Sequence, residues 1–314
     1  MRGLIAGRWH QCIELDDKLA EKFGKSGYNN QLDSDTFKQS PERFHLYVSY
    51  ACPFAHRVIL TRSLLKLENH LSMSVVDPYL SRQQGWSFAT PEHPSPYEGV
   101  TADKLYDSRF LYELYQRSHP DYTGRVTVPV LWDRATETIV SNNSFDIMRA
   151  MNLAFGHQQA EADLYPEHLR PEIDRANEMI TQAINLGVYR VGMATSQAMY
   201  EAELLQLFDA LEKLDRQLEN RCFIVGDQLT EADCLLFTTA VRFDIAYYPV
   251  LYTSLKYWRD FPNLSRHRDR LMEIPAIATT VKPDQYLRHY FDDDSFINRR
   301  QLSNGHFIVP KVSC

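Results

Sequence analysis

The 314-residue chain has few cysteines, and their arrangement excludes several classes of site. Its five cysteines are Cys12, Cys52, Cys222, Cys234 and Cys314, and no two of them form a C-x-x-C pair. An odd and scattered set predicts no disulfide framework, and no His, Cys, Asp or Glu cluster has metal-ligand spacing. We therefore expect no metal, and a protein of a reducing cytoplasm.

Long apolar runs and basic clusters are also absent. No uninterrupted apolar stretch approaches the roughly 20 residues that a membrane helix needs, and the opening MRGLIAGRWHQC turns polar too early for a signal peptide. The formal net charge of −7, with no lysine or arginine run, disfavours a nucleic-acid partner. Neither a glycine-rich phosphate loop nor a G-x-S-x-G motif occurs. We expect a soluble protein that binds neither membranes nor nucleic acid.

The composition is that of a globular protein, 44% hydrophobic and 24% charged, and the pattern changes along the chain. Residues 1–41, rich in Gly, Asn, Asp and Lys, predict an irregular N-terminal extension. Residues 42–157 mix strand and helix patterns around a Pro- and Gly-containing insertion at about 79–105. Residues 158–314 show helical spacing, with a capping box in TEAD at 230–233. The sequence predicts an α/β domain followed by an all-helical domain and a C-terminal tail.

The α/β domain begins with a clear strand and helix. In RFHLYVS, Phe44, Leu46 and Val48 alternate with polar residues, which indicates a strand. Pro53 opens a run with helical spacing, because proline is tolerated in the first helical turn. LSMSVVDP then indicates a second strand, so the pattern is a βαβ unit with parallel strands.

Cys52 stands between that strand and that helix, at or near the N-cap. The unpaired N–H groups and the dipole at this end of a helix stabilise a thiolate over a thiol. Arg57 could add positive potential. The alternative is an inert cysteine that merely caps the helix, which is the commoner situation for an arbitrary cysteine. The narrower strand–Cys–Pro–helix context favours a reactive thiolate.

Seven motifs continue the pattern along most of the chain. They are, in order, VSYACPFAHRVIL, GWSF, GRVTVPVLWD, IVSNNSFDIMR, NLGVYRVGMATSQ, LTEADCLLFTTAVRFD and RHYF. From about Phe44 to Phe291 the chain is thereby similar to the xi-class glutathione transferases, the glutathionyl-hydroquinone reductases. The resemblance implies a thioredoxin-like domain followed by a helical glutathione-transferase C-terminal domain. It also implies glutathione as co-substrate, glutathionyl-hydroquinones as small-molecule substrates, and a homodimer.

The resemblance makes Cys52 the nucleophile. Ala55 stands where a dithiol glutaredoxin has its second cysteine, so a second glutathione would have to resolve the mixed disulfide. Phe54 replaces the tryptophan that follows Cys-Pro in the family. His56 could be mistaken for a general base, but a thiolate stabilised by a helix needs none, which favours a structural role. Cys234, inside an apolar run, is expected in the core.

The resemblance also implies a glutathione site. Val128-Pro129 matches the segment with the cis proline of thioredoxin folds, whose main chain pairs with the cysteinyl unit. Asn143-Ser144 stands where the family has Glu-Ser, at a helix N-terminus that holds the γ-glutamyl carboxylate. Because Asn143 lacks the glutamate charge, we expect glutathione binding weaker by about 1 kcal/mol. Trp86 is assigned to the site, with a core aromatic as the alternative. The expected lining residues are Trp86, Arg125, Val126, Thr127, Val128, Pro129, Asn143 and Ser144.

Three tyrosines match a second cluster of the family. By composition alone none of the 18 tyrosines stands out, because tyrosines commonly pack with a hydrogen-bonded hydroxyl. By resemblance, Tyr189 gives a proton to the departing hydroquinone carbon, while Tyr247 and Tyr290 bond the substrate oxygens and help to keep Cys52 ionised. Tyr248 is an adjacent candidate for the role of Tyr247.

Other functions share the same thiolate. They are an omega-like thioltransferase or dehydroascorbate reductase, and a dehalogenase of glutathionylated aromatics. A weakly catalytic glutathione-fold binding protein is the alternative from another class, and Asn143 is the feature that favours it. Cys52 together with Tyr189 favours a glutathione-dependent reductase. We expect it to remove glutathione from glutathionyl-hydroquinones through a Cys–glutathione mixed disulfide, giving hydroquinone and oxidised glutathione.

Overall fold

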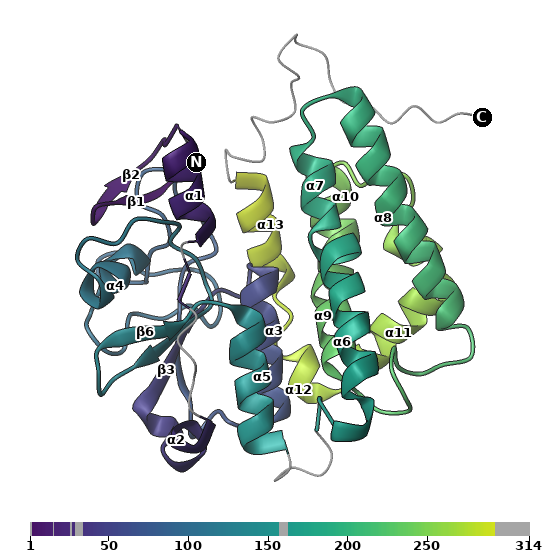
Figure 1. Cartoon of the computed structure of the whole chain (residues 1–314), viewed down its shortest axis with the longest axis horizontal. Coiled ribbons are helices and arrows are strands. Elements are labelled where there is room, and N and C mark those ends of the chain that lie inside the picture. The colour runs from purple at the N-terminus through teal and green to yellow at the C-terminus, as the bar shows by residue number, and fades with distance from the viewer. Residues whose placement is uncertain (1, 15, 26, 29–33, 157–162, 293–314) are drawn as a thin grey trace. The chain divides into compact units, whose positions relative to one another are not determined.

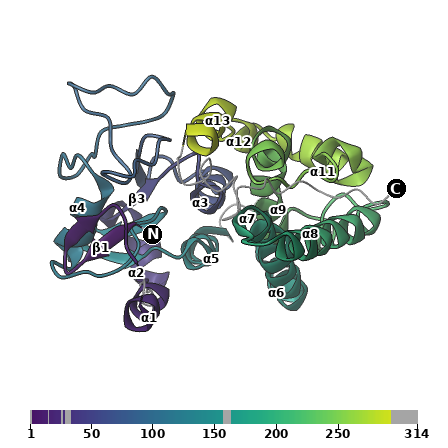
Figure 2. The same ribbon diagram turned by 90° about the horizontal axis from the view of Figure 1, so that it is seen from above.

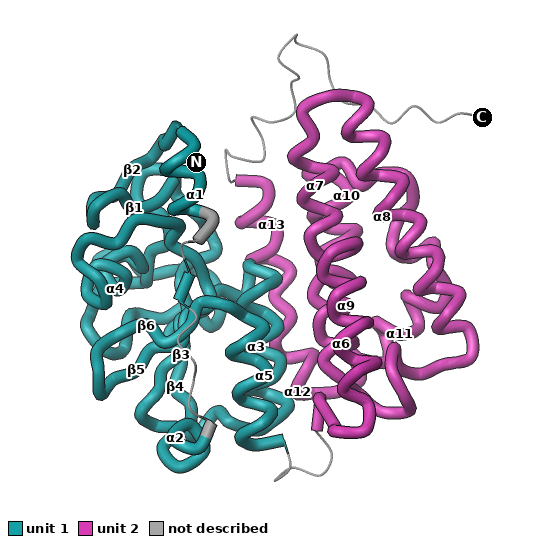
Figure 3. The backbone as a smooth tube through the Cα atoms, viewed as in Figure 1, with its two compact units in different colours: residues 1–159 teal, residues 160–314 magenta. Residues whose placement is uncertain are grey.

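The computed structural model describes residues 2–14, 16–25, 27–28, 34–156 and 163–292. The chain divides into two compact units, residues 1–159 and residues 160–314, which Figure 3 colours separately. The first unit is α/β and the second is helical, so the expected fold class is confirmed (Figure 1). Among the described residues, no helix is both long enough and apolar enough to cross a membrane.

A mixed sheet and its helices make up the first unit. Its elements are β1 (Gly3–Ile5), β2 (Arg8–His10), α1 (Asp17–Lys25), α2 (Ser34–Gln39), the 3-10 turn η1 (Pro41–Arg43), β3 (Phe44–Val48), α3 (Pro53–Leu64), β4 (Ser72–Val75), α4 (Leu111–Ser118), β5 (Val130–Asp133), β6 (Thr138–Ser141) and α5 (Ser144–Phe155). The strand order is β4-β3-β5-β6, with β3 parallel to β4 and antiparallel to β5. The predicted βαβ unit is therefore β3-α3-β4, and α3 packs against α5 (Figure 1).

Every residue of β3 is buried, although apolar and polar side chains alternate along it. The two ring nitrogens of His45 lie 2.6 Å and 2.8 Å from the hydroxyls of Ser72 and Ser74 on β4. Burial lowers the pKa of His45 to about 3, so the ring is neutral. Tyr47 donates to Asp103 of the insertion at 3.0 Å. The insertion thus covers polar side chains of the central strand that would otherwise meet water.

The described part of the N-terminal extension contains two strands and two helices, so the prediction of an irregular segment is wrong. β1 and β2 form an antiparallel hairpin in which Gly3 pairs with His10, and the helices α1 and α2 follow. Gly7 in the hairpin turn has φ +71°, and a Cβ there would lie 1.9 Å from the carbonyl oxygen of Pro120. The glycines that suggested irregular chain instead allow a tight turn against a neighbouring loop.

Helices make up the second unit. Its elements are η3 (Glu167–Leu169), α6 (Arg170–Met179), the π-helical η4 (Ile180–Asn185), α7 (Gly187–Met193), α8 (Gln197–Gln217), α9 (Glu231–Arg242), the π-helical η5 (Phe243–Tyr247), α10 (Tyr248–Val250), η6 (Trp258–Asp260), α11 (Pro262–Met272), α12 (Pro275–Ala278) and α13 (Pro283–Asp292). α7 packs against α8, and α6 against α9 (Figure 2). α11 contacts both α8 and α9.

The predicted capping box opens α9. The main-chain N–H of Thr230 donates to Asp233 Oδ2 at 2.8 Å, and the other carboxylate oxygen accepts from Ile224 N at 2.9 Å. His267 Nε2 lies 2.8 Å from that second oxygen. Because both oxygens of this buried carboxylate are occupied, the start of α9 is firmly held, and α9 leads directly into η5.

Candidate active site

Cys52 is the N-cap of α3, with Pro53 as the first helical residue. Its Sγ is partly exposed and lies 3.7 Å from the carbonyl oxygen of Val128. The first turn closes through His56 N, which donates to the carbonyl oxygen of Cys52 at 2.9 Å. The sulfur therefore stands at the positive end of a twelve-residue helix, where a thiolate is stabilised.

The neighbours of Cys52 on α3 are buried. His56 has no exposed surface, which agrees with a structural role rather than that of a solvent-facing base. The guanidinium of Arg57, 2% exposed, lies 5.0 Å from the ring centroid of Phe54. Ala55 is fully buried at the position of a dithiol partner. The residues around Cys52 thus provide packing and a positive charge, and α3 contains no second cysteine.

The other described cysteines belong to other parts of the chain than α3. Cys12 and Cys222 are exposed, and Cys234 is buried in α9, as predicted for a core residue. Cys314 lies outside the described residues.

The segment Arg125–Val128 leads into β5 and contacts the sulfur through its last residue. The Val128–Pro129 peptide is cis, as the resemblance implies. The N–H of Val128 makes no hydrogen bond to another residue that the structure describes, so it remains available to a ligand. Arg125 is exposed, whereas Val126 is 9% exposed. This segment can offer an extended peptide a main-chain donor directly beside Cys52.

Asn143 and Ser144 begin α5, a second helix N-terminus in the same unit. The Asn143 side chain accepts from the N–H of Phe145 at 2.9 Å and so caps the helix. Ser144 is 7% exposed. Such a helix start binds carboxylates through its main-chain donors and its dipole. The capping bond thereby occupies the side-chain oxygen of Asn143.

Trp86 lies in the insertion and is 4% exposed. Its carbonyl oxygen accepts from the N–H of Leu111 at the start of α4, at 3.0 Å. This burial suits the alternative reading of a core aromatic, and its part in a glutathione site stays a prediction.

The three tyrosines come together in the second unit. The hydroxyls of Tyr189, on α7, and Tyr290, on α13, lie 2.6 Å apart, and Tyr290 donates to Tyr247 at 3.3 Å. Tyr247 and Tyr290 have no exposed surface, whereas Tyr189 is partly exposed. Tyr248 points elsewhere and stacks on Tyr257, with ring centroids 3.9 Å apart. The geometry therefore selects Tyr247 over its neighbour.

Comparison with known proteins decides the family. The model of the glutathione S-transferase N-terminal domain matches residues 51–153, and that of the C-terminal domain matches residues 197–270. A glutathionyl-hydroquinone reductase of Sphingobium chlorophenolicum is 40% identical over 94% of this chain and 92% of its own. The structure of a xi-class enzyme from Natrialba magadii matches 99% of this chain and 96% of its own, with 39% identity and a TM-score of 0.86. The chain belongs to the xi class of glutathione transferases.

A second xi-class likeness bears on the ligand. The glutathione-bound structure of YqjG, a glutathione transferase homolog from Escherichia coli K-12, matches 97% of this chain and 94% of its own. The identity is 38% and the TM-score is 0.82.

Within the described part of this chain, no group of three or more His, Cys, Asp or Glu side chains could hold a metal ion.

Sequence reasoning missed Arg242, a buried cation on α9 that interacts electrostatically with the tyrosine cluster of this xi-class chain. Its guanidinium is fully buried, donates to the carbonyl oxygen of Thr238 at 2.7 Å and lies 3.9 Å from the ring centroid of Tyr286. Burial opposes its charge, but the surrounding tyrosines Tyr286, Tyr247, Tyr290 and Tyr189 outweigh it and raise the pKa of Arg242. The sequence signal that could have identified Arg242 is its position at the end of the apolar run CLLFTTAVR, where a charged residue is unusual.

Burial raises the pKa of Tyr290 well above its ordinary value, the neighbouring hydroxyls of Tyr189 and Tyr247 add to that rise, and Arg242 opposes it. Tyr290 therefore stays a protonated phenol, and it shares hydrogen bonds with Tyr189 and Tyr247. Two π-helical segments adjoin it, since η4 precedes α7 and η5 ends at Tyr247. π-Helical turns are rare and occur frequently at functional sites.

Proposed function

We propose that this protein is a glutathionyl-hydroquinone reductase. It removes glutathione from glutathionyl-hydroquinones through a mixed disulfide between Cys52 and glutathione. Two independent observations favour this reaction. Similar curated proteins carry this name. The chain also combines a cysteine at a helix N-cap with a hydrogen-bonded cluster of three tyrosines.

Glutathione binds in this proposal through its main chain and its charged ends. The N–H of Val128, which bonds to no other residue that the structure describes, pairs with the cysteinyl unit in the manner of an added strand beside Cys52. The γ-glutamyl carboxylate takes the N-terminus of α5 at Ser144. Asn143 is neutral and already caps the helix, so it contributes less to the peptide's amino group than a glutamate would.

The first half-reaction is a transfer of the glutathione sulfur. The Cys52 thiolate attacks that sulfur, so an S–S bond forms as the bond between sulfur and the aromatic carbon breaks. The electron pair goes to the ring carbon, which takes a proton from Tyr189, and free hydroquinone leaves. General acids of this kind contribute typically about 10²–10⁴-fold to a rate.

The second half-reaction restores the thiolate. The thiol proton of a second glutathione replaces the one that Tyr189 gave up. As a thiolate, this glutathione attacks the glutathione sulfur of the mixed disulfide and leaves as oxidised glutathione, while Cys52 departs as a thiolate. The aromatic ring has then been reduced by two electrons, and two glutathione sulfurs have been oxidised to one disulfide. Fully buried Ala55, in place of a second cysteine, supports this single-thiol route.

The series of hydrogen bonds between the three tyrosine hydroxyls is the observation that favours a reductase over the alternative functions. Tyr189 is partly exposed, and Tyr290 and Tyr247 stand behind it in one hydrogen-bonded series. A small polar disulfide, as an omega-like thioltransferase would take, needs no such phenolic donors. A dissociating hydroquinone carbanion needs a proton, and its oxygens need hydrogen bonds.

Trapping of the mixed disulfide tests the proposal. The protein is mixed with glutathionyl-menadiol without free glutathione, digested without reductant and analysed by mass spectrometry. We expect glutathione on the Cys52 peptide together with one equivalent of menadiol, and neither in Cys52→Ser. A menadiol yield that is unchanged in Cys52→Ser would contradict the covalent route. We further propose that the protein forms a homodimer in the cytoplasm. Size-exclusion chromatography with light scattering checks the dimer.

A further inference from the structure

The N-terminal extension is built onto the loop that precedes the Arg125–Val128 segment. Leu4 and Gly124 exchange two main-chain hydrogen bonds of 2.9 Å, and Gly7 N donates to the carbonyl oxygen of Tyr122 at 3.0 Å. Gly3 lies so close that a Cβ there would stand 2.5 Å from the carbonyl oxygen of Gly124. The hairpin thus continues a main-chain ladder along residues 122–124.

A second contact of the extension reaches the glutathione-binding segments themselves. Tyr28 N donates to Asn142 Oδ1 at 3.0 Å, and Asn142 N donates to the carbonyl oxygen of Tyr28 at 3.3 Å. Asn142 directly precedes Asn143 and the start of α5. One residue of the extension is therefore joined by two hydrogen bonds, one to the side chain and one from the main chain, to the residue next to the expected γ-glutamyl site.

The same Asn142 side chain continues inward. Its Nδ2 donates to the hydroxyl of Tyr115 at 3.2 Å, and that hydroxyl donates to the carbonyl oxygen of Thr127 at 2.8 Å. The hydroxyl also accepts from Thr127 N at 3.2 Å. Tyr115 is fully buried, and burial raises its pKa, so it remains a donor. Both main-chain groups of the residue before Val128 are thereby held by one phenol.

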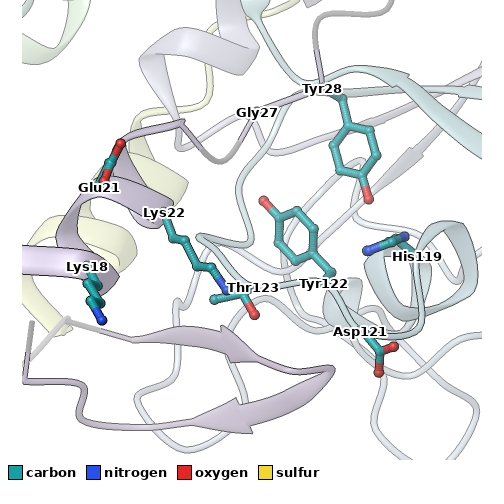
Figure 4. A pocket seen from close by; sticks show the side chains of 9 residues that line it. All are labelled: Lys18, Glu21, Lys22, Gly27, Tyr28, His119, Asp121, Tyr122 and Thr123. Atoms are coloured by element: carbon teal, nitrogen blue, oxygen red, sulfur yellow. The ribbon is translucent and has the colours of Figure 1, made fainter.

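Aromatic packing strengthens this connection. Tyr28 stacks on Tyr122, with ring centroids 5.6 Å apart and 17° between planes, and meets Tyr115 edge-on at 5.9 Å. Tyr122 donates to the carbonyl oxygen of Arg125 at 3.0 Å. The rings of Tyr28 and Tyr122 stand on the wall of a pocket of about 710 Å³, between α1 and the 119–123 loop (Figure 4). Two phenols thus hold the Arg125–Val128 main chain, and Tyr28 packs on both.

We propose that the N-terminal extension is a positioning element for glutathione: Tyr28, acting through Asn142, Tyr115 and Tyr122, holds Arg125–Val128 in the shape that receives the tripeptide. This inference rests on the proposed function, since it concerns the same site. Tyr28 and Tyr115 are positioning residues and touch no reacting atom. Their loss should weaken binding of the conjugate and of free glutathione alike, because both present the same tripeptide, while the chemistry at Cys52 continues once the site is filled.

The test compares full-length variants by calorimetric titration with glutathione and by steady-state kinetics. Tyr28→Ala removes the ring, and Tyr115→Phe removes only a buried hydroxyl and keeps the shape. We expect each to raise the Kd and KM for glutathione about fivefold to tenfold, the range of one lost hydrogen bond, with kcat changed less than about twofold. Tyr28→Phe, which keeps the ring, should restore binding, and exposed Lys22→Ala on α1 is the control.

Coupling is the sharper readout. If Tyr28 acts through Tyr115, the double variant Tyr28→Ala/Tyr115→Phe should bind no more weakly than the weaker single variant. Full additivity, an unchanged Kd in both single variants, or a fall in kcat without a change in KM would each overturn the inference. A parent protein that binds no glutathione would contradict the proposed function itself. A parent that binds with unaffected variants contradicts only the positioning role.

Discussion

The hydroxyl oxygens of Tyr189 and Tyr290 lie 2.6 Å apart, although the two residues are 101 positions apart in the sequence. The Tyr290 hydroxyl in turn donates a hydrogen bond to the Tyr247 hydroxyl at 3.3 Å. When Tyr189 gives up its proton, the Tyr290 hydroxyl can turn its single proton from Tyr247 to the phenolate that forms and so stabilise it without water. Because Tyr189 alone of the three is partly exposed, it is the member suited to reach a substrate.

The first prediction concerns this acid. Tyr189→Phe keeps the ring, which packs edge-on to Tyr247 at 5.9 Å, and removes the proton donor. We expect kcat to fall by about 10²-fold or more, as for other lost general acids, with little change in the Kd for glutathione. Tyr248→Phe is the matched control, because that residue stacks on Tyr257 instead. A stronger loss in Tyr248→Phe than in Tyr189→Phe would reverse the assignment.

Arg242 gives a prediction about pH. The Arg242 cation lowers the pKa of Tyr290 against the larger effect of burial, so its removal should raise the pKa of the hydrogen-bonded cluster. A group that must be protonated to act then stays active to higher pH. In Arg242→Met the alkaline limb of the kcat profile should move upward, whereas Arg242→Lys should lie closer to the parent. Lys213→Met, at an exposed position of α8, controls for the loss of one surface charge. An unmoved limb in a folded Arg242→Met protein contradicts this role.

Asn143 gives a prediction about affinity. Asn143→Glu restores the charge of the family motif, and a charge-assisted hydrogen bond is worth about twice a neutral one, so glutathione should bind about fivefold more tightly. The same change removes the cap to Phe145 N, which should lower the free energy of unfolding by about 1 kcal/mol. Calorimetric titration and denaturant unfolding measure the two effects separately. Weaker binding in Asn143→Glu would show that the cap, rather than the missing charge, governs the site.

His45 gives a prediction about acid stability. Its folded pKa of about 3 is below the unfolded value of about 6.5, so the unfolded chain binds the extra proton first as pH falls. Stability from this group is therefore complete above about pH 6.5 and declines by about 1.4 kcal/mol per pH unit towards pH 3. Urea unfolding at pH 7, 6 and 5 should show a shallower decline in His45→Gln. Equal slopes would mean that other groups control acid unfolding.

Local patterns predicted the parts of the site that depend on neighbours in sequence. Cys52 as N-cap follows from Pro53 and the start of helical spacing, and the capping box at Thr230 follows from a four-residue motif. Both are decided within one helical turn, where main-chain donors must find nearby acceptors. The resemblance supplied the cis peptide at Pro129, which no periodicity indicates.

Long-range pairing explains what the sequence did not predict. Gly3 and Gly7 suggest irregular chain until the partner loop at 120–124 is known, more than one hundred residues away. Tyr247 and Tyr248 are equivalent in sequence, and only the path of the chain through η5 decides which of them joins Tyr290. Asn143 as a cap was foreseeable, because asparagine is a favoured N-cap residue, but the family comparison drew attention to its missing charge.

One turnover assay tests the central claim most directly. The protein is incubated with glutathionyl-menadiol and excess glutathione, and products are separated by chromatography. The account predicts that menadiol and oxidised glutathione appear in equal amounts, and that Cys52→Ala forms neither although it still binds glutathione. Absence of menadiol with the parent protein, or its undiminished release by Cys52→Ala, would contradict a reductase that acts through Cys52.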